Sequence, residues 1–94
     1  MLSIVTLCSV GRTVTLLRAE PGGRQKPFLT GTTVQVSKVR DSEGGAMRIL
    51  LDLQIGPGVR RTIDFTAEGV TGIVVGGVAH TIVAGKAAAE VDPG

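Results

Sequence analysis

The chain has 94 residues, a formal net charge of +2 and a single cysteine, which bounds it to one domain without an intrachain disulfide. Fourteen Gly, thirteen Val and ten Thr are typical of strands and turns, and 43% hydrophobic residues exclude a disordered chain. No apolar run is long enough to span a membrane, and the apolar start lacks the basic residues of a signal peptide. We therefore expect a β protein with no membrane partner, in the cytoplasm or in a phage particle assembled there.

The first half of the chain predicts three strands and one loop. Residues 3–10 are apolar on both faces when read with a period of two, which favours a strand covered on both sides. Residues 13–19 predict a second strand. Residues 20–27 contain two prolines and a Gly-Gly pair, which predicts a loop. Residues 32–40 predict a third strand. The alternation of apolar and polar residues along it is interrupted, and one extra residue near Ser37–Lys38 would restore it, so we expect a bulge there.

The middle of the chain predicts a hairpin. Residues 46–55 carry apolar side chains at every second position, and residues 59–65 return after Gly56-Pro57-Gly58. A two-residue loop would place Leu51 opposite Asp64, whereas a three-residue loop places it opposite Ile63. The predicted pairs are therefore Ile55 with Val59, Leu51 with Ile63 and Ile49 with Phe65.

The end of the chain predicts a second hairpin and a tail. Two valine-rich runs, residues 70–75 and 78–84, flank Gly76-Gly77, which is a strong hairpin signal and pairs Ile73 with His80. Residues 86–94 are polar and alanine-rich, and a mobile tail or one helical turn would fit them. The fold predicted is a single all-β domain over residues 1–85, a small antiparallel barrel or two-sheet sandwich of about seven short strands with little or no helix.

The residues that often carry catalysis each have a structural interpretation in this pattern. Asp52 and Asp64 lie on the outer face of the first hairpin, beside arginines. His80 is the only histidine and has no second ligand nearby for a metal. Cys8 has no acid or base partner in its strand and looks like a small core residue. We therefore predict a protein that is not an enzyme, with no catalytic, cofactor-binding or metal site.

The charge is distributed unevenly along the chain. Residues 1–40 contain six basic residues and one acidic residue, whereas residues 41–94 contain four basic and seven acidic residues. Seven basic residues are candidates for contacts with a partner or with phosphate groups. They are Arg18, Arg24, Lys26, Lys38, Arg40, Arg60 and Arg61.

Three functions remain open. With only two aromatic residues the core is thin, and a partner subunit would supplement it. This favours a structural or assembly protein that binds copies of itself and other proteins, such as a decoration, connector or tail accessory protein of a phage or another particle. The first alternative is a small nucleic-acid binder that contacts backbone phosphates, although stacking aromatics are scarce. The second is a small inhibitor or a ligand-sequestering oligomer.

Overall fold

The computed structural model describes residues 2–40, 47–83 and 90–93, which form one antiparallel sheet and one short helix. In chain order the elements are β1 (Leu2–Ser3), α1 (Ile4–Leu7), β2 (Thr13–Ala19), β3 (Gln25–Arg40), β4 (Met47–Gly56), β5 (Val59–Asp64), β6 (Val70–Val75), β7 (Val78–Val83) and β8 (Glu90–Pro93). The predicted fold class, nearly all β with little helix, is confirmed. No helix in these described ranges is long and apolar enough to cross a membrane.

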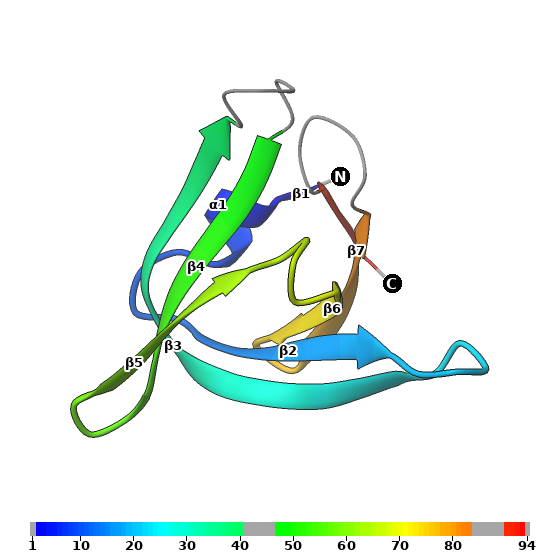
Figure 1. Ribbon diagram of the computed structural model, residues 1–94, viewed down its shortest axis with the longest axis horizontal. Helices are drawn as coiled ribbons and strands as arrows, with labels where there is room; N and C mark the ends of the chain where they lie inside the picture. The colour runs from blue at the N-terminus through cyan, green and yellow to red at the C-terminus, as the bar shows by residue number, and fades with distance from the viewer. Residues whose placement is uncertain (1, 41–46, 84–89, 94) are drawn as a thin grey trace.

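The strands lie side by side in the order β1-β8-β7-β6-β2-β3-β4-β5. β3 is 16 residues long and pairs with β2 along its first half and with β4 along its second, so it joins the two halves of the sheet. Figure 1 shows that the sheet curves strongly around one core. Within the described residues, β1 and β5 are its two edges and do not pair with each other, so the sheet is not closed as a barrel.

The core occupies the concave side of the sheet, which we call the inner face and define by Val14, Leu16, Ile49, Leu51 and Ile73. Phe65 is the largest fully buried side chain, and α1 adds Ile4 and Leu7. Phe28 is half-buried and packs against the cluster. Both phenylalanines therefore contribute to the core. Each buried side chain of this kind contributes about 1.5–3 kcal/mol of transfer free energy.

The predicted strand over residues 3–10 is wrong. Only Leu2–Ser3 is a strand, and it pairs with β8, while Ile4–Leu7 forms α1. Cys8 N–H donates to the Ile4 carbonyl at 2.9 Å, which closes the helical turn. The buried residues Ile4, Leu7 and Cys8 have the i, i+3, i+4 spacing that places side chains on one side of a helix. The same run of apolar residues therefore satisfies both periods, and its packing on the inner face selects the helix.

The loop between the second and third strands is shorter than predicted. β3 begins at Gln25, so only residues 20–24 connect it to β2, and Gly22 and Gly23 both have positive φ. Pro27 lies inside β3, opposite Leu17, next to a register shift that makes Phe28 the extra residue. A strand tolerates a proline at such an irregularity, because the backbone hydrogen bond to the neighbouring strand is already lost there.

Where β3 pairs with β4 the bulge is at Val34, and the predicted bulge near Ser37–Lys38 is wrong. The register shifts between Thr33 and Gln35, whereas Val36, Lys38 and Arg40 continue on one face opposite Leu51, Ile49 and Met47. Lys38 occupies an inner-face position without being buried. Its side chain is exposed at this position, so no second slip is needed to move its ammonium group into water.

The β4–β5 hairpin has the predicted register over most of its length. Leu51 pairs with Ile63, and Phe65 N–H donates to the Ile49 carbonyl at 3.1 Å. The predicted pair of Ile55 with Val59 is wrong, because Gly56 pairs with Val59 and a register shift leaves Ile55 as the bulge residue. The loop is therefore Pro57-Gly58, and Pro followed by Gly with φ +68° is the signature of a type II turn.

The β6–β7 hairpin is confirmed, with Ile73 opposite His80 and Val75 opposite Val78. Its two turn glycines have φ of +59° and +78°, the combination that a type I′ turn requires. The segment predicted as a tail contains β8, which pairs with β7 and with β1, so the sheet extends beyond residue 85. The predicted helical turn in this tail falls partly on residues outside the described ranges.

Candidate interaction surfaces

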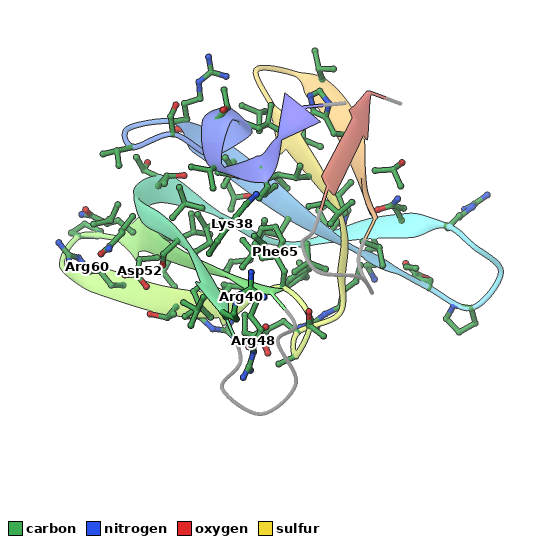
Figure 2. The ribbon with its side chains drawn as sticks, turned by 90° about the horizontal axis from the view of Figure 1, so that it is seen from above. Lys38, Arg40, Arg48, Asp52, Arg60 and Phe65 are labelled. Atoms are coloured by element: carbon green, nitrogen blue, oxygen red, sulfur yellow. The ribbon has the colours of Figure 1, made fainter. Side chains whose placement is uncertain are left out.

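The seven basic residues come from three parts of the sheet, and two of these parts meet where Arg18 and Arg61 both approach Glu68. Arg18, Arg24 and Lys26 lie at or beside the β2–β3 connection, where Arg18 and Lys26 are direct cross-strand neighbours. Lys38 and Arg40 lie at the other end of β3. Arg60 and Arg61 lie on β5, and Figure 2 shows Arg60 near the end of the β4–β5 hairpin, away from Arg40. The asymmetry of charge along the sequence is therefore divided in space.

Two of these seven basic residues share one carboxylate, in a group that we call the Glu68 cluster (Arg18, Phe28, Arg61 and Glu68). The Glu68 Oε1 atom lies 3.1 Å from Arg61 Nη2 and 3.6 Å from Arg18 Nη2, and Arg18 Nε donates to the Glu68 carbonyl at 2.8 Å. Arg18 also stacks over the Phe28 ring, with its guanidinium carbon 3.9 Å from the ring centroid. This cluster ties β2 to β5, which are not neighbours in the sheet.

The Glu68 cluster leaves these two arginines less available to a phosphate or an acidic partner. The side chains of Arg18 and Arg61 are 45% and 50% exposed, so each ion pair contributes at most about 1 kcal/mol. Binding phosphate with them requires competition with Glu68. The cluster is therefore better suited to fixing the position of the β5–β6 turn than to binding a ligand.

The outer face of the β4–β5 hairpin carries alternating charges. Arg48 pairs with the Asp64 carboxylate, and the Thr62 hydroxyl donates to the Asp52 carboxylate. Figure 2 shows Asp52 beside Arg60 on the hairpin. No ion-pair partner of Arg60 is present in the part of the chain that the structure describes. The neighbouring Asp52 carboxylate is bonded to Thr62, and Arg60 forms no ion pair with it within the described residues.

Asp64 is the most constrained of these charged residues. Its Oδ1 atom accepts the backbone N–H of Thr66 at 3.1 Å and of Ala67 at 3.2 Å, which shapes the turn into β6. Burial raises the pKa of this carboxyl, but the Ala67 N–H, the hydrogen bond and charge of Arg48, and the Thr66 N–H together outweigh burial. The pKa is therefore held below its ordinary value of 3.8. Asp64 is a charged turn-forming residue at neutral pH.

The backbone of β5 is paired on one side only. Because Phe65 N–H donates to Ile49 and hydrogen-bonded pairs alternate along an antiparallel ladder, Ile63 and Arg61 also direct their backbone groups to β4. Arg60, Thr62 and Asp64 direct theirs to the opposite side. There the Asp64 carbonyl accepts Glu68 N–H at 2.9 Å, and no strand of the described residues lies beside the rest.

The outward-directed groups of Arg60 and Thr62 are also accessible, because four consecutive residues, 59–62, are exposed, whereas Asp64 is partly buried. We call this side of β5 the open edge and define it by Arg60, Thr62 and Asp64. It is a short row of backbone donors and acceptors that another strand could extend.

Exposed apolar side chains gather at two turns. Val10 is 70% exposed and Val78 is 53% exposed, next to an open hollow of about 350 Å³ lined by Arg12, Thr13, Val75 and Gly76. Ile55 and Val59, at 38% and 49%, flank the β4–β5 turn. Isolated exposed valines are common on protein surfaces, so neither group identifies a site by itself.

The remaining candidate groups are buried. Cys8 is fully buried, and desolvation raises the pKa of its thiol to about 12. His80 is buried at an inner-face position opposite Ile73, and its Nδ1 atom has no hydrogen-bond partner in the described part of the chain. Over these same ranges no cluster of three or more His, Cys, Asp or Glu residues could hold a metal ion.

The sequence analysis missed two residues that organise this region. Glu68 lies between the two predicted hairpins and has no partner that the sequence indicates, because its pairing with Arg18 and Arg61 depends on the curvature of the sheet. Asp64 was assigned to a solvated face, although an Asp that is followed by a turn often accepts the N–H two residues ahead. That pattern in Asp64-Phe65-Thr66 was the available signal. Comparisons with family models, with curated proteins and with solved structures find no match for this chain.

Proposed function

We propose that this protein is a non-enzymatic assembly subunit that works through contacts with copies of itself and with other proteins. The observation that carries the proposal is the open edge of β5, where exposed side chains flank outward backbone groups that no strand of the described residues pairs with. Folded proteins usually cover or block such edges, because each one can add a further strand. A subunit that assembles uses the same property for binding.

The structural roles of the reactive side chains support the non-enzymatic part of the proposal. General acid–base catalysis needs a titratable group that can reach a substrate. Asp64 holds a turn, Asp52 binds a neighbouring hydroxyl, and Cys8 and His80 are buried. The exposed surface offers cations, threonines and valines, which are suited to binding rather than to bond breaking.

The concrete form that we propose is an accessory subunit of a phage or another particle assembled in the cytoplasm, such as a decoration, connector or tail protein. In a symmetric particle each subunit repeats the same contact, so a small and individually weak interface is sufficient. A 9.6 kDa domain with a thin aliphatic core fits this use, because neighbouring copies add to its stability by mass action.

Multi-angle light scattering after size-exclusion chromatography tests the proposal. We expect the mean mass to rise above the 9.6 kDa of one chain as the protein concentration increases from about 10 µM to about 500 µM, the range in which weak interfaces associate. A constant mass of one chain across this range would contradict the proposed function.

A further inference from the structure

We infer that the open edge of β5 binds the open edge of a second copy, antiparallel and across a two-fold axis centred on Thr62. This inference rests on the proposed function and identifies the surface that it uses. Geometry and charge identify the partner as a second copy of β5. The outward backbone groups belong to Arg60, Thr62 and Asp64, so two β5 strands can form hydrogen bonds only where these residues of one copy lie opposite those of the other.

The register follows from the side chains. Centring the axis on Thr62 places Thr62 opposite its own copy and Arg60 opposite Asp64 of the partner subunit, so a cation meets a carboxylate at both ends. Centring it on Arg61 places two Arg61 side chains against each other, and centring it on Arg60 does the same with Arg60. Like charges directly opposite are unfavourable. The charge pattern therefore favours one register.

This pairing supplies Arg60 with an ion-pair partner, which it does not have among the described residues. Asp64 already binds Arg48, and it would lie between Arg48 and Arg60 of the partner subunit. The two Thr62 residues exchange backbone bonds, and each Asp64 N–H donates to the partner's Arg60 carbonyl, about four hydrogen bonds in all. The Asp64 carbonyl stays with Glu68 N–H, so the pairing ends where the turn begins.

The size of the contact sets its strength. Five residues on each side bury less than the roughly 1,000 Å² typical of stable interfaces, so the dimer dissociates in the micromolar range or above. Its charge pairs are exposed, so added salt weakens it.

Thr62→Pro is the direct test. Proline removes the outward N–H, which β4 does not use, and prolines are tolerated on an edge strand in this orientation. The variant also loses the hydrogen bond from Thr62 to Asp52, so Thr62→Val is the matched control that loses the same bond and keeps the N–H. In sedimentation velocity we expect Thr62→Pro to weaken self-association by at least about tenfold and Thr62→Val by less than about threefold.

Arg60→Glu provides a second variant that does not depend on how well proline is accommodated. It replaces the attraction to Asp64 of the partner subunit with repulsion and breaks no ion pair of the described chain, so it should fold normally and associate more weakly than wild type by about tenfold. Arg24→Glu, with the same charge change in the β2–β3 loop, should associate like wild type. Circular dichroism checks that each variant is folded.

The outcomes separate this inference from the proposed function. If wild type associates while folded Thr62→Pro or Arg60→Glu associates equally well, the β5 pairing is overturned and the assembly function stands. If wild type stays monomeric at every concentration, both fail. Association that is lost in Thr62→Pro and Arg60→Glu and kept in Thr62→Val and Arg24→Glu supports the pairing.

Discussion

Replacing Asp64 with Asn tests the account of the turn between β5 and β6. The change keeps the size of the side chain and an amide oxygen that can still accept N–H groups, but it removes the negative charge. Hydrogen bonds to a charged group contribute about 1.5–3 kcal/mol, roughly twice those to a neutral one. The Arg48 side chain is 48% exposed, so the ion pair adds less than about 1 kcal/mol. We therefore expect Asp64→Asn to lower the free energy of unfolding by about 1–2 kcal/mol at pH 7.

The difference in free energy of unfolding between wild type and Asp64→Asn should decrease as the pH falls. Because the pKa of Asp64 is lower in the folded protein than the ordinary 3.8, the stabilisation is fully present above the unfolded pKa and is lost as the pH falls through the folded pKa. Below about pH 4 the carboxyl of the unfolded chain begins to bind a proton that the folded carboxyl still excludes, so the difference between wild type and Asp64→Asn should shrink. Urea unfolding from pH 7 down to the lowest pH at which both remain folded measures it.

Asp52→Asn is the matched control, because Asp52 lies on the same face and its carboxylate accepts one hydroxyl. It should lower the free energy of unfolding by less than about 1 kcal/mol. A difference between wild type and Asp64→Asn that is absent at pH 7, or that grows as the pH falls, would refute the reasoning.

Three further predictions follow from packing and charge. Gly31→Ala should destabilise the protein by about 1–3 kcal/mol in urea unfolding, because its Cβ would lie 2.9 Å from the Gln54 carbonyl oxygen. Gly56→Ala, whose Cβ would make only an ordinary contact with Val59 at 4.0 Å, should differ from wild type by less than about 1 kcal/mol, and equal effects would show that the Gly31 contact is unimportant. The Cys8 thiol should react with Ellman's reagent at pH 8 only after unfolding, because it is buried and its pKa is about 12; rapid reaction of the native protein would contradict this. Fluorescence anisotropy with single-stranded DNA at low salt should show only weak binding, because the basic residues are divided among three places; tight binding that weakens steeply with salt would instead favour the nucleic-acid alternative.

The hairpins could be predicted from the sequence because their signals are local. Gly76-Gly77 between two valine-rich runs predicts a two-residue turn. In the other hairpin, the alternation of apolar residues from Ile49 to Leu53 determines which side of the strand is buried. A shift by one residue would expose that whole apolar set, so the register is strongly determined. The position of the bulge at Ile55 was missed because a three-residue loop and a two-residue loop with a bulge place Leu51 opposite Ile63 equally well.

The features that the sequence did not predict depend on contacts between distant segments. The apolar run at Ile4–Cys8 fits a strand and a helical turn equally, and only its packing on the inner face distinguishes them. β8 is too polar to be recognised as a strand without its neighbours β7 and β1. The Glu68 cluster exists because the curved sheet brings β2 close to β5. The open edge is likewise a property of strand order, which a single sequence does not determine.

Amide hydrogen exchange at different protein concentrations tests the central claim most directly, because it reads β5 residue by residue. We predict that the outward amides of Thr62 and Asp64 gain protection as the concentration rises, whereas those of Arg61 and Ile63, which already bond to β4, do not change. Protection that does not depend on concentration at these two outward positions, while the mass of the particle increases, would contradict the claim that the protein associates through this edge.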